Sequence, residues 1–356
     1  MDRQGVMQRF LSKEMRGIEI GALYNPTVPK EDGWNVISVD HDTMEGLLVA
    51  YAGNPYVSAG SLQPVDVVWN HGLLSAALKN GGYAVGCFDY IVASHVIEHF
   101  PDLLGTLMDF EKILAEGGVL SLAVPDQRYC FDFFMPWSST ADLLMAYGEA
   151  RSRHTKASFF RMAAYNAVGI VNHGHRDELV SAQDIGLQSD LHHAYARFCT
   201  HDESTDAGYV DNHTWYFTPS TFELVMLELR ALGLLSLEVE MVERGPWGEF
   251  LVCMRKSSEP LPLTAEELNA RRLGLLKQSV RELAHRAQML DRGQQEAANV
   301  NDSLHAAQQE RIAHLEAALS KVHKSTSWRV TWPIRALKSA WSVSYTHLTL
   351  PTIYSV

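Results

Sequence analysis

An excess of basic charge, cysteine pairs and long apolar runs are all missing from this 356-residue sequence, and each absence excludes a class of protein. The formal net charge of −12 disfavours nucleic acid as a partner, because a protein that neutralises phosphates needs a basic surface. The four cysteines lie far apart without a CxxC pair, which fits neither a zinc site nor a dense disulfide framework. No apolar run approaches the roughly 18 residues that would span a bilayer.

The amino terminus also lacks the features of a secretion signal. Residues 1–16 are interrupted by several charged side chains and contain no apolar core of the kind that such a signal needs. Together with the cysteine usage, this predicts a cytoplasmic protein. The hydrophobic content of 46% and the length are sufficient for a well-formed core, in one large or two modest domains.

Apolar segments of strand length alternate with helix-like segments through the first half of the chain, which predicts βαβ units and a mostly parallel sheet. The segment 101–115 has apolar residues at helical spacing and a stop signal at Gly117-Gly118. A second amphipathic helix is predicted over 218–232. The predicted strands are 17–21, 35–40, 65–69, 88–94, 118–124, 236–243 and 249–255.

A long irregular stretch, 127–212, separates the fifth predicted strand from the second helix, and it is aromatic and rich in histidine. A segment inserted there lies at the carboxyl edge of the sheet, where ligands bind, so we expect it to form a lid or a substrate pocket. We therefore assign residues 1–258 to one α/β domain, with 127–212 as its substrate-side insertion.

The composition changes after residue 262 to Ala, Glu, Gln, Leu and Arg, with apolar residues repeating at steps of four and three. This predicts a coiled coil over 263–322 with a polar centre, and hence a candidate homodimer; a single solvated helix is the alternative. Residues 323–342 are basic and tryptophan-rich, which suits either a peripheral contact with an anionic inner membrane or docking on a neighbouring domain. Residues 343–356 resemble a translated sequencing-adapter read-through and are predicted to be non-native, so that the natural protein would continue beyond residue 342.

Three segments carry the chemistry. Residues 17–21, Gly-Ile-Glu-Ile-Gly, end one strand with an acid and a glycine; Val39-Asp40 ends the next with an acid; and 88–99 ends a third with the cluster Ser-His-Val-Ile-Glu-His. In this order and spacing they resemble the cofactor half of a class I S-adenosylmethionine-dependent methyltransferase. The resemblance implies a Rossmann-like sheet of seven mostly parallel strands with the last antiparallel, and S-adenosylmethionine as the methyl donor.

The residues at these strand ends suggest how the donor is held. Gly21 lets the backbone approach the amino-acid end of the donor, because a side chain there would collide with it. Asp40 is placed to accept hydrogen bonds from the ribose hydroxyls, shared with His41 or Asp42, although it could also be a simple turn residue. The predicted donor-binding residues are Glu19, which is expected to support the loop, Gly21, Ala22, Asp40, His41, Trp69, which is expected to stack on adenine, Asn70, Ser94 and Glu98.

The glycine pattern separates this site from a dinucleotide site. NAD is disfavoured because Gly21 is followed by no second or third glycine of a G-x-G-x-x-G run. Two positions depart from many methyltransferases: Leu23 stands where they carry glycine, and Trp69-Asn70 replaces an acidic pair near the adenine. The chain is most similar to a subgroup with a Gly-Ala-x-x-Asn-Pro run.

The acceptor side is predicted to be built from histidines. His95 and His99 lie at the carboxyl edge of a central strand, where an imidazole could take a proton from an acceptor hydroxyl. The alternative is that both shape the pocket or cap the following helix. His213 is a third catalytic candidate, because similar proteins carry a His-x-x-Trp-x-Pro-like run before the final helix. The other histidines and aspartates of 173–213 match no metal-ligand spacing, so no metal is predicted.

The acceptor class comes from resemblance. Residues 15–256 are similar to methyltransferases of bacterial surface-polysaccharide biosynthesis, and the Ser-x-Ser-Trp-Arg run at 325–329 recurs in proteins with glycosyltransferase modules. This implies a sugar or lipid-linked glycan as acceptor, with aromatic residues such as Phe133 and Trp215 as candidates to stack on it. Two alternatives stay open: a small-metabolite methyltransferase, and a non-catalytic scaffold of a glycan assembly complex.

Overall fold

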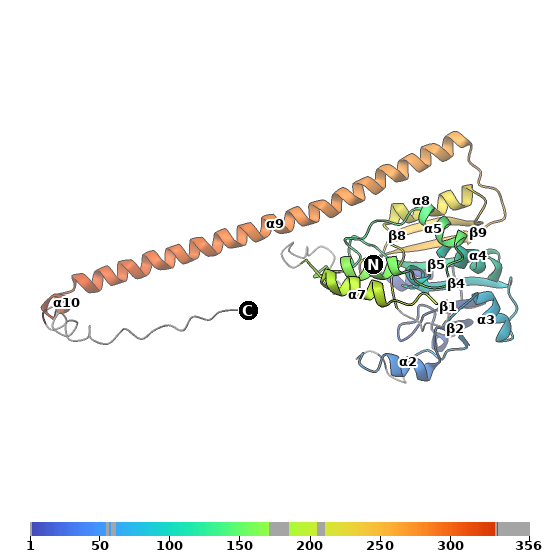
Figure 1. The fold of residues 1–356 in the computed structure, drawn as a ribbon, viewed down its shortest axis with the longest axis horizontal. Helices are drawn as coiled ribbons and strands as arrows, with labels where there is room; N and C mark the ends of the chain where they lie inside the picture. Colours follow the sequence, from blue (N-terminus) through green and yellow to red (C-terminus); the bar gives the residue numbers. More distant parts are fainter. Residues whose placement is uncertain are drawn as a thin grey trace. The chain divides into compact units, whose positions relative to one another are not determined.

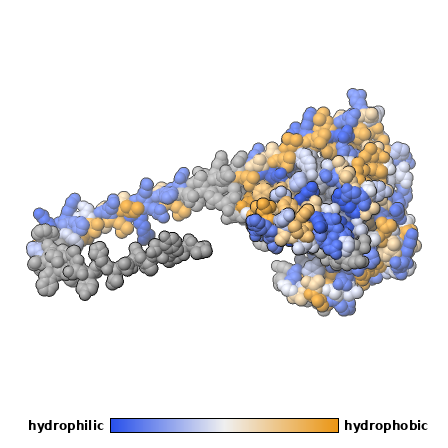
Figure 2. Space-filling view, in the orientation of Figure 1, coloured by the Kyte–Doolittle hydropathy of each residue, from blue (hydrophilic) through white to orange (hydrophobic). Residues whose placement is uncertain are grey.

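The computed structural model describes residues 2–54, 57, 62–170, 185–204, 211–331 and 333, and the chain divides into two compact units, Met1–Gln294 and Gln295–Val356. The first unit contains the sheet and all the residues predicted to form the site. Figure 2 shows hydrophilic and hydrophobic residues interspersed over its visible face.

A seven-stranded sheet, in the order β3-β2-β1-β4-β5-β9-β8, forms the centre of the first unit (Figure 1). The first five strands pair in parallel, whereas β9 runs antiparallel to both β5 and β8. The predicted Rossmann-like α/β sheet is therefore confirmed. The strands are β1 (Gly17–Ile20), β2 (Val36–Asp40), β3 (Val67–Val68), β4 (Phe88–Ser94), β5 (Leu114–Pro125), β8 (Leu237–Arg244) and β9 (Glu249–Lys256).

The central strands are buried on both faces, as their continuous apolar runs require. In β4, Ile91 and Ala93 belong to the larger core cluster, while Tyr90 and Val92 belong to a cluster on the other face. The larger cluster includes side chains of α3 (Leu74–Asn80), α4 (Leu103–Ile113), α5 (Thr140–Gly148) and α8 (Pro219–Ala231), and the other includes those of α1 (Arg3–Met7). From β1, the strands β2 and β3 extend the sheet to one side, and β4 and β5 extend it to the other. The direction of the strand order therefore switches between β1 and β4, and a ligand crevice is expected at such a switch point.

Local capping fixes where the two predicted helices begin. The Asp102 side chain accepts a hydrogen bond from the Gly105 backbone N–H at the start of α4, and Thr218 does the same with Thr221 at the start of α8. The predicted stop of the first helix was wrong. The helix ends at Ile113 and β5 starts at Leu114, so Gly117, with a φ of 75°, lies within the strand, at an irregularity in its pairing with β4.

The insertion carries its own small elements. It contains α5, α6 (Lys156–Tyr165) and α7 (Leu191–Thr200), and a two-stranded sheet of β6 (Ala167–Val168) and β7 (Gly186–Leu187). The remaining short elements are η1 (Lys30–Asp32), α2 (Met44–Ala50), η2 (Ile97–His99) and α10 (Thr326–Val330).

The helix α9 (Ala265–Lys324) covers nearly all of the predicted 263–322 segment, and its first half packs on the sheet domain. Ser220 of α8 donates a hydrogen bond to buried Glu282 at 2.5 Å and lies 3.0 Å from the Ser279 hydroxyl, while Arg286 donates to the Phe133 carbonyl at 2.6 Å. The first compact unit accordingly extends to Gln294, beyond the predicted domain end at 258. The pairing of α9 as a coiled coil and the domain division stay predictions. Among the helices of the described residues, none combines the length and apolarity that crossing a membrane requires.

Candidate active site

A cavity of about 570 Å³ opens at the carboxyl ends of β1, β2 and β4. Of the predicted donor residues, five line it: Gly21, Asp40, His41, Trp69 and Asn70. Of the predicted catalytic histidines, His95 and His99 also line it. The structure therefore brings together, in one space, seven residues that lie as far apart in sequence as 21 and 99.

The loop after β1 shows why glycine is needed at position 21. Gly21 has a φ of 69°, in the left-handed region that disfavours side chains, and a Cβ there would lie 3.0 Å from the Val96 side chain. Its N–H donates to the Val39 carbonyl of the neighbouring strand at 2.9 Å, so the loop leaves the sheet directly into the cavity wall.

Glu19 lies beneath this loop and does not line the cavity. Its carboxylate accepts hydrogen bonds from the backbone N–H groups of Thr27 at 2.5 Å and Val28 at 3.2 Å, and these bonds hold the returning end of the loop. Burial raises the pKa of Glu19 to about 7, against the opposing effect of the two backbone bonds. Ala22 is buried and does not line the cavity either.

At the end of β2, Asp40 and His41 form a pair on the cavity wall. The Asp40 Oδ1 accepts a hydrogen bond from the His41 backbone N–H at 2.8 Å and lies 2.8 Å from the His41 Nδ1. This contact raises the pKa of His41. Asp40 is only 7% exposed, so a ribose that reached it would meet a carboxylate already oriented by its neighbour.

Trp69 and Asn70 follow β3 and complete the predicted donor side. The Trp69 ring lies 5.2 Å from the Phe100 ring, and its Nε1 donates to the Gly72 carbonyl at 3.0 Å. Both aromatic rings line the cavity, so an apolar wall is present where the adenine was predicted to bind.

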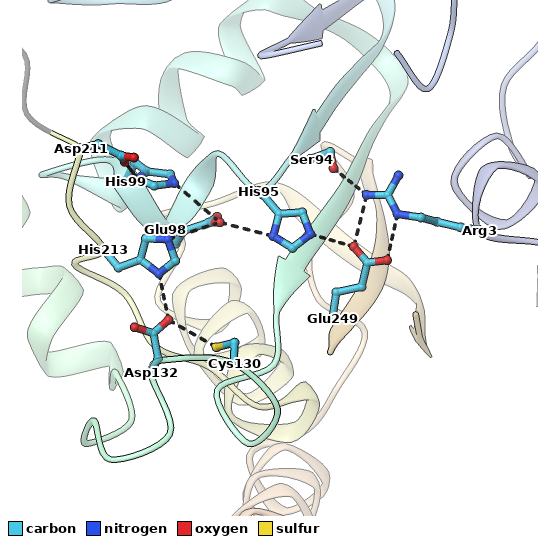
Figure 3. Close-up of polar contacts among 10 residues, drawn as sticks. All are labelled: Arg3, Ser94, His95, Glu98, His99, Cys130, Asp132, Asp211, His213 and Glu249. Atoms are coloured by element: carbon cyan, nitrogen blue, oxygen red, sulfur yellow. Dashed lines mark hydrogen bonds and ion pairs between the residues drawn. The ribbon is translucent and has the colours of Figure 1, made fainter. Parts of the chain in front are cut away.

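Ser94 and His95 end β4 in a polar network with Arg3 of α1. Arg3 donates to the Ser94 hydroxyl at 2.6 Å and to Glu249 at 2.8 Å, and the His95 Nε2 lies 2.8 Å from the same Glu249 (Figure 3). Glu249 begins the antiparallel β9, which is why it reaches this edge of the sheet. Ser94 does not line the cavity and is occupied by Arg3, whereas His95 does and has a φ of 54°, an unusual backbone conformation for a non-glycine residue.

Glu98, His99 and His213 form a compact cluster beside the cavity (Figure 3). The Glu98 Oε1 lies 3.8 Å from the His99 Nε2 and 4.0 Å from the His213 Nε2. His213 is far from Glu98 in the sequence, and a backbone hydrogen bond joins the two segments: the Thr214 N–H donates to the Glu98 carbonyl at 2.8 Å. Glu98 and His213 are buried and do not line the cavity, so His213 can act on a bound acceptor only through its neighbours.

In both histidines of this cluster, the ring nitrogen that points away from Glu98, Nδ1, lies next to a second carboxylate. The His213 Nδ1 lies 2.8 Å from the Asp132 Oδ2, and the His99 Nδ1 lies 2.8 Å from the Asp211 Oδ1. Burial alone would lower the pKa of His213, but the hydrogen bond to Asp132 and the nearby acids raise it. The contact with His99 lowers the pKa of Asp211.

The insertion supplies the opposite wall of the cavity. Its lining residues include Arg151, His154, Phe159, His201 and Asp202. The His201 ring stacks on Phe159 with centroids 3.8 Å apart, and its Nε2 contacts the His154 carbonyl. Burial, with smaller effects from neighbouring histidines, lowers the pKa of His154 to about 4, so this imidazole is neutral at physiological pH.

Some expectations about the acceptor wall were wrong in detail. Phe133 and Trp215 are buried in core clusters and do not line the cavity; Phe159 and Tyr51 are the aromatic residues that flank it away from Trp69. Of the scattered acidic and histidine residues considered as metal ligands, 173, 175 and 177 lie outside the described residues, and His192 and His193 are exposed on α7.

Sequence reasoning missed Asp132, Glu249 and Arg3. Arg3 and Asp132 stand in no motif and at no predicted strand end, and Glu249 stands at the amino end of the predicted strand 249–255 rather than at a carboxyl end. Each acts through a residue far away in sequence. Asp211 had a usable signal, because it lies two residues before the singled-out His213.

The sheet order and the cavity at its switch point are those of a Rossmann-like fold of the class I methyltransferase type. Residues 7–168 match the family model described as a methyltransferase domain, which confirms the predicted enzyme class over that region.

Comparison with solved structures found several distant likenesses. One is to a protein described as a Zn-dependent alcohol dehydrogenase from Rhodobacter sphaeroides, at 13% identity and a TM-score of 0.39, covering 72% of this chain and 90% of that chain. Another is to a SAM-dependent methyltransferase from Methanosarcina mazei, at 13% identity and a TM-score of 0.36, covering 71% and 98%. A third is to a methyltransferase from Mesorhizobium loti, at 13% and 0.31, covering 70% and 95%. These TM-scores are low, and no conclusion rests on them; a comparison with curated protein sequences found no match.

Proposed function

We propose that this chain transfers the methyl group of S-adenosylmethionine to a hydroxyl of a sugar or lipid-linked glycan in bacterial polysaccharide biosynthesis. The observation that carries the proposal is that a single cavity is lined on one side by Gly21, Asp40 and Trp69, and on the other by histidines and the insertion. A donor and an acceptor bound in the same space can meet, and holding them in line is the main requirement of methyl transfer.

On the donor side, the protein has to bind and orient S-adenosylmethionine and has little covalent chemistry to perform. Asp40 would accept hydrogen bonds from the ribose, the bend at Gly21 would admit the amino-acid end, and Trp69 with Asn70 would hold the adenine. In the transfer, the acceptor oxygen forms a bond to the methyl carbon, the carbon–sulfur bond breaks, and S-adenosylhomocysteine leaves as a neutral thioether. The acceptor hydroxyl loses its proton to a base.

The acceptor half has polar groups suited to a hydroxylated molecule. His95, His99, His201 and Asp202 line the cavity, and such groups can accept or donate hydrogen bonds to several hydroxyls. His95 and His99 are the proposed bases because they line the cavity, and His213, whose ring contacts that of His99, would position His99 from behind. The resemblance of the chain to polysaccharide methyltransferases supports a sugar rather than an apolar acceptor.

The proposal is tested first by calorimetry with S-adenosylhomocysteine. Asp40→Ala should weaken binding by about 1–3 kcal/mol, because the ribose loses its acceptor. Asp32→Ala, which removes an exposed acid outside the cavity, should bind as tightly as the unchanged protein. Failure of the unchanged chain to bind at millimolar concentration would favour the scaffold alternative.

The acceptor is tested by methyl transfer from labelled donor to three matched panels: nucleotide sugars and lipid-linked glycans, quinones, and small amines. Transfer to a sugar hydroxyl supports the proposal. Transfer restricted to quinones or amines would retain the enzyme class and reject the acceptor.

A further inference from the structure

Glu98 is a buried acid that the donor site does not explain. It is 1% exposed, and neither of its carboxylate oxygens has a hydrogen-bond partner among the described residues. A buried carboxylate normally requires hydrogen bonds or a cation, because burial removes its hydration. Imidazole nitrogens of three histidines surround its Oε1 at distances of 3.7–4.0 Å, and Figure 3 shows these three rings around Glu98.

Two of these histidines are oriented with one nitrogen toward Glu98 and the other toward a second carboxylate. Asp211 holds the Nδ1 of His99, and Asp132 holds the Nδ1 of His213, each at 2.8 Å. An imidazole that donates its Nδ1–H to a carboxylate presents a lone pair at Nε2, which is the arrangement found around metal-bound histidines. The His213 Nδ1 makes such a hydrogen bond with Asp132, so its Nε2 faces the buried Glu98 oxygen as one acceptor facing another. A cation between these atoms and the His99 Nε2 would resolve this contact.

We propose that Glu98, His99 and His213 bind a divalent transition-metal ion, with Zn²⁺ as the best fit. One ligand atom from each residue lies within 4.8 Å of the other two. Zinc bonded at about 2.0–2.2 Å would draw such atoms to roughly 3.3 Å apart in tetrahedral geometry. The side chains need to move inward by about half an ångström, and the proposal replaces the expectation that no metal is bound.

The ligand chemistry selects the ion. Mg²⁺ and Ca²⁺ prefer oxygen ligands throughout, whereas two imidazoles and one carboxylate suit zinc and its first-row neighbours. Asp132 and Asp211 are then positioning residues, since they act through the histidines they hold. The spacing of 98, 99 and 213 matches no sequence motif, which is why the chain did not disclose the site.

Three protein ligands leave zinc an open coordination position, as in catalytic rather than structural sites. His99 lines the cavity, so the ion would lie at the cavity wall. We infer that the open position takes an oxygen of the acceptor, and zinc binding would make a hydroxyl there more acidic. The role of the ion in activating an acceptor hydroxyl rests on the proposed function, whereas the proposal that the ion binds does not depend on it.

The site is tested on the full chain, stripped of metal, by calorimetric titration with Zn²⁺ and by the absorption spectrum of bound Co²⁺. Glu98→Gln keeps the shape of the side chain and removes its charge, and it should weaken zinc binding by at least about 100-fold. Asp132→Asn should weaken it by about 10–100-fold, because the amide can no longer fix the histidine tautomer. His192→Ala, which removes an exposed imidazole on α7, should leave the affinity unchanged.

Thermal unfolding separates a metal site from a merely structural cluster. Zinc should raise the unfolding temperature of the unchanged protein and of His192→Ala, but not that of Glu98→Gln. Without metal, Glu98→Gln should be at least as stable as the metal-free unchanged protein, because the variant buries no charge. If Glu98→Gln does not fold, the effect of zinc on the unfolding temperature is compared between Asp132→Asn and the unchanged protein instead. Equal zinc affinity in the unchanged protein and both variants overturns the proposal, as does the absence of saturable binding. Zinc binding without S-adenosylhomocysteine binding would retain the metal site and reject the methyltransferase role. S-adenosylhomocysteine binding without zinc binding would retain the methyltransferase role and reject the metal site.

Discussion

At the scale of single residues, Glu19 couples the loop of the donor site to pH. Its carboxyl has an ordinary pKa of 4.5 and a pKa of about 7 in the folded protein, chiefly because it is buried. Between these values the folded protein holds a proton that the unfolded chain has lost, so stability is highest below pH 4.5 and falls as the pH rises through 7. The difference between the two pKa values corresponds to about 3 kcal/mol.

Glu19→Gln should remove this pH dependence, because an amide carries no charge and its oxygen can still accept a hydrogen bond from Thr27. Urea unfolding at pH 5.5 and pH 8 should show the unchanged protein losing about 2 kcal/mol more than the variant between the two conditions, because part of the effect is already lost at pH 5.5. The matched control is Glu31→Gln, which changes an exposed acid on η1 and should follow the unchanged protein. A constant difference between Glu19→Gln and the unchanged protein at both pH values would contradict the assignment.

Single residues were predictable where their role depends on a strand end. Gly21 follows β1, Asp40 ends β2, and Trp69 and Asn70 follow β3. Parallel strands place their carboxyl ends at one edge of the sheet, so the meeting of these residues in one cavity was predictable from the sequence. Ser94 also ends a strand, but Arg3 of α1 occupies its hydroxyl. No local pattern indicates such a contact between residues 91 positions apart.

At the scale of elements, apolar runs and capping residues predicted strands and helices well, and the boundary between α4 and β5 less well. The pair Gly117-Gly118 was taken as a helix stop because glycine usually follows a helix. In the fold the same glycines lie inside β5, in an irregular stretch between Leu114 and Val119, the residues of β5 that pair with β4 on either side of it. The attachment of α9 was equally hidden: its contacts with α8 and the insertion join segments about 60 or more residues apart.

These contacts predict where the chain can be cut. A chain ending at 294 should keep the fold of the first unit, whereas one ending at 262 loses the hydrogen bonds of Ser279 and Glu282 with Ser220 and of Arg286 with Phe133. At about 1 kcal/mol each, three such bonds amount to about 3 kcal/mol, which lowers the unfolding temperature by roughly 6–12 °C. Circular dichroism melting of both chains measures the difference.

A control within the uncut chain separates packing from chain length. Lys277→Ala changes an exposed side chain of the same helix segment and should melt like the unchanged protein, whereas Ser220→Ala should destabilise it by leaving Glu282 buried without its donor. Identical melting of the chains ending at 262 and 294 would show that the domain ends near 258, as the composition alone suggested.

At the scale of the whole molecule, the second half of α9 carries an apolar seam that the described chain leaves uncovered. Ile312, Leu315, Leu319 and Val322 follow one another at steps of three and four residues and are each about half exposed, between 48% and 59%. Along this part of the helix, Figure 2 shows hydrophobic residues among hydrophilic ones. Steps of this kind place side chains along one stripe of a helix, where a second copy can pack against them.

We expect the full chain to form a concentration-dependent dimer through this seam, and sedimentation equilibrium should detect it. Fully burying a leucine contributes about 1.5–3 kcal/mol, so Leu315→Glu combined with Leu319→Glu should raise the dimer dissociation constant by at least about 100-fold. Ala317→Glu adds one glutamate on the opposite side of the helix and should leave the dimer intact. A monomer at all concentrations, or equal weakening by both sets of changes, would mean that α9 is a solvated helix. Among the described side chains of α9 beyond the first unit, Leu304 is the one large exposed apolar residue outside the seam, so pairing of this part of the helix depends chiefly on the seam.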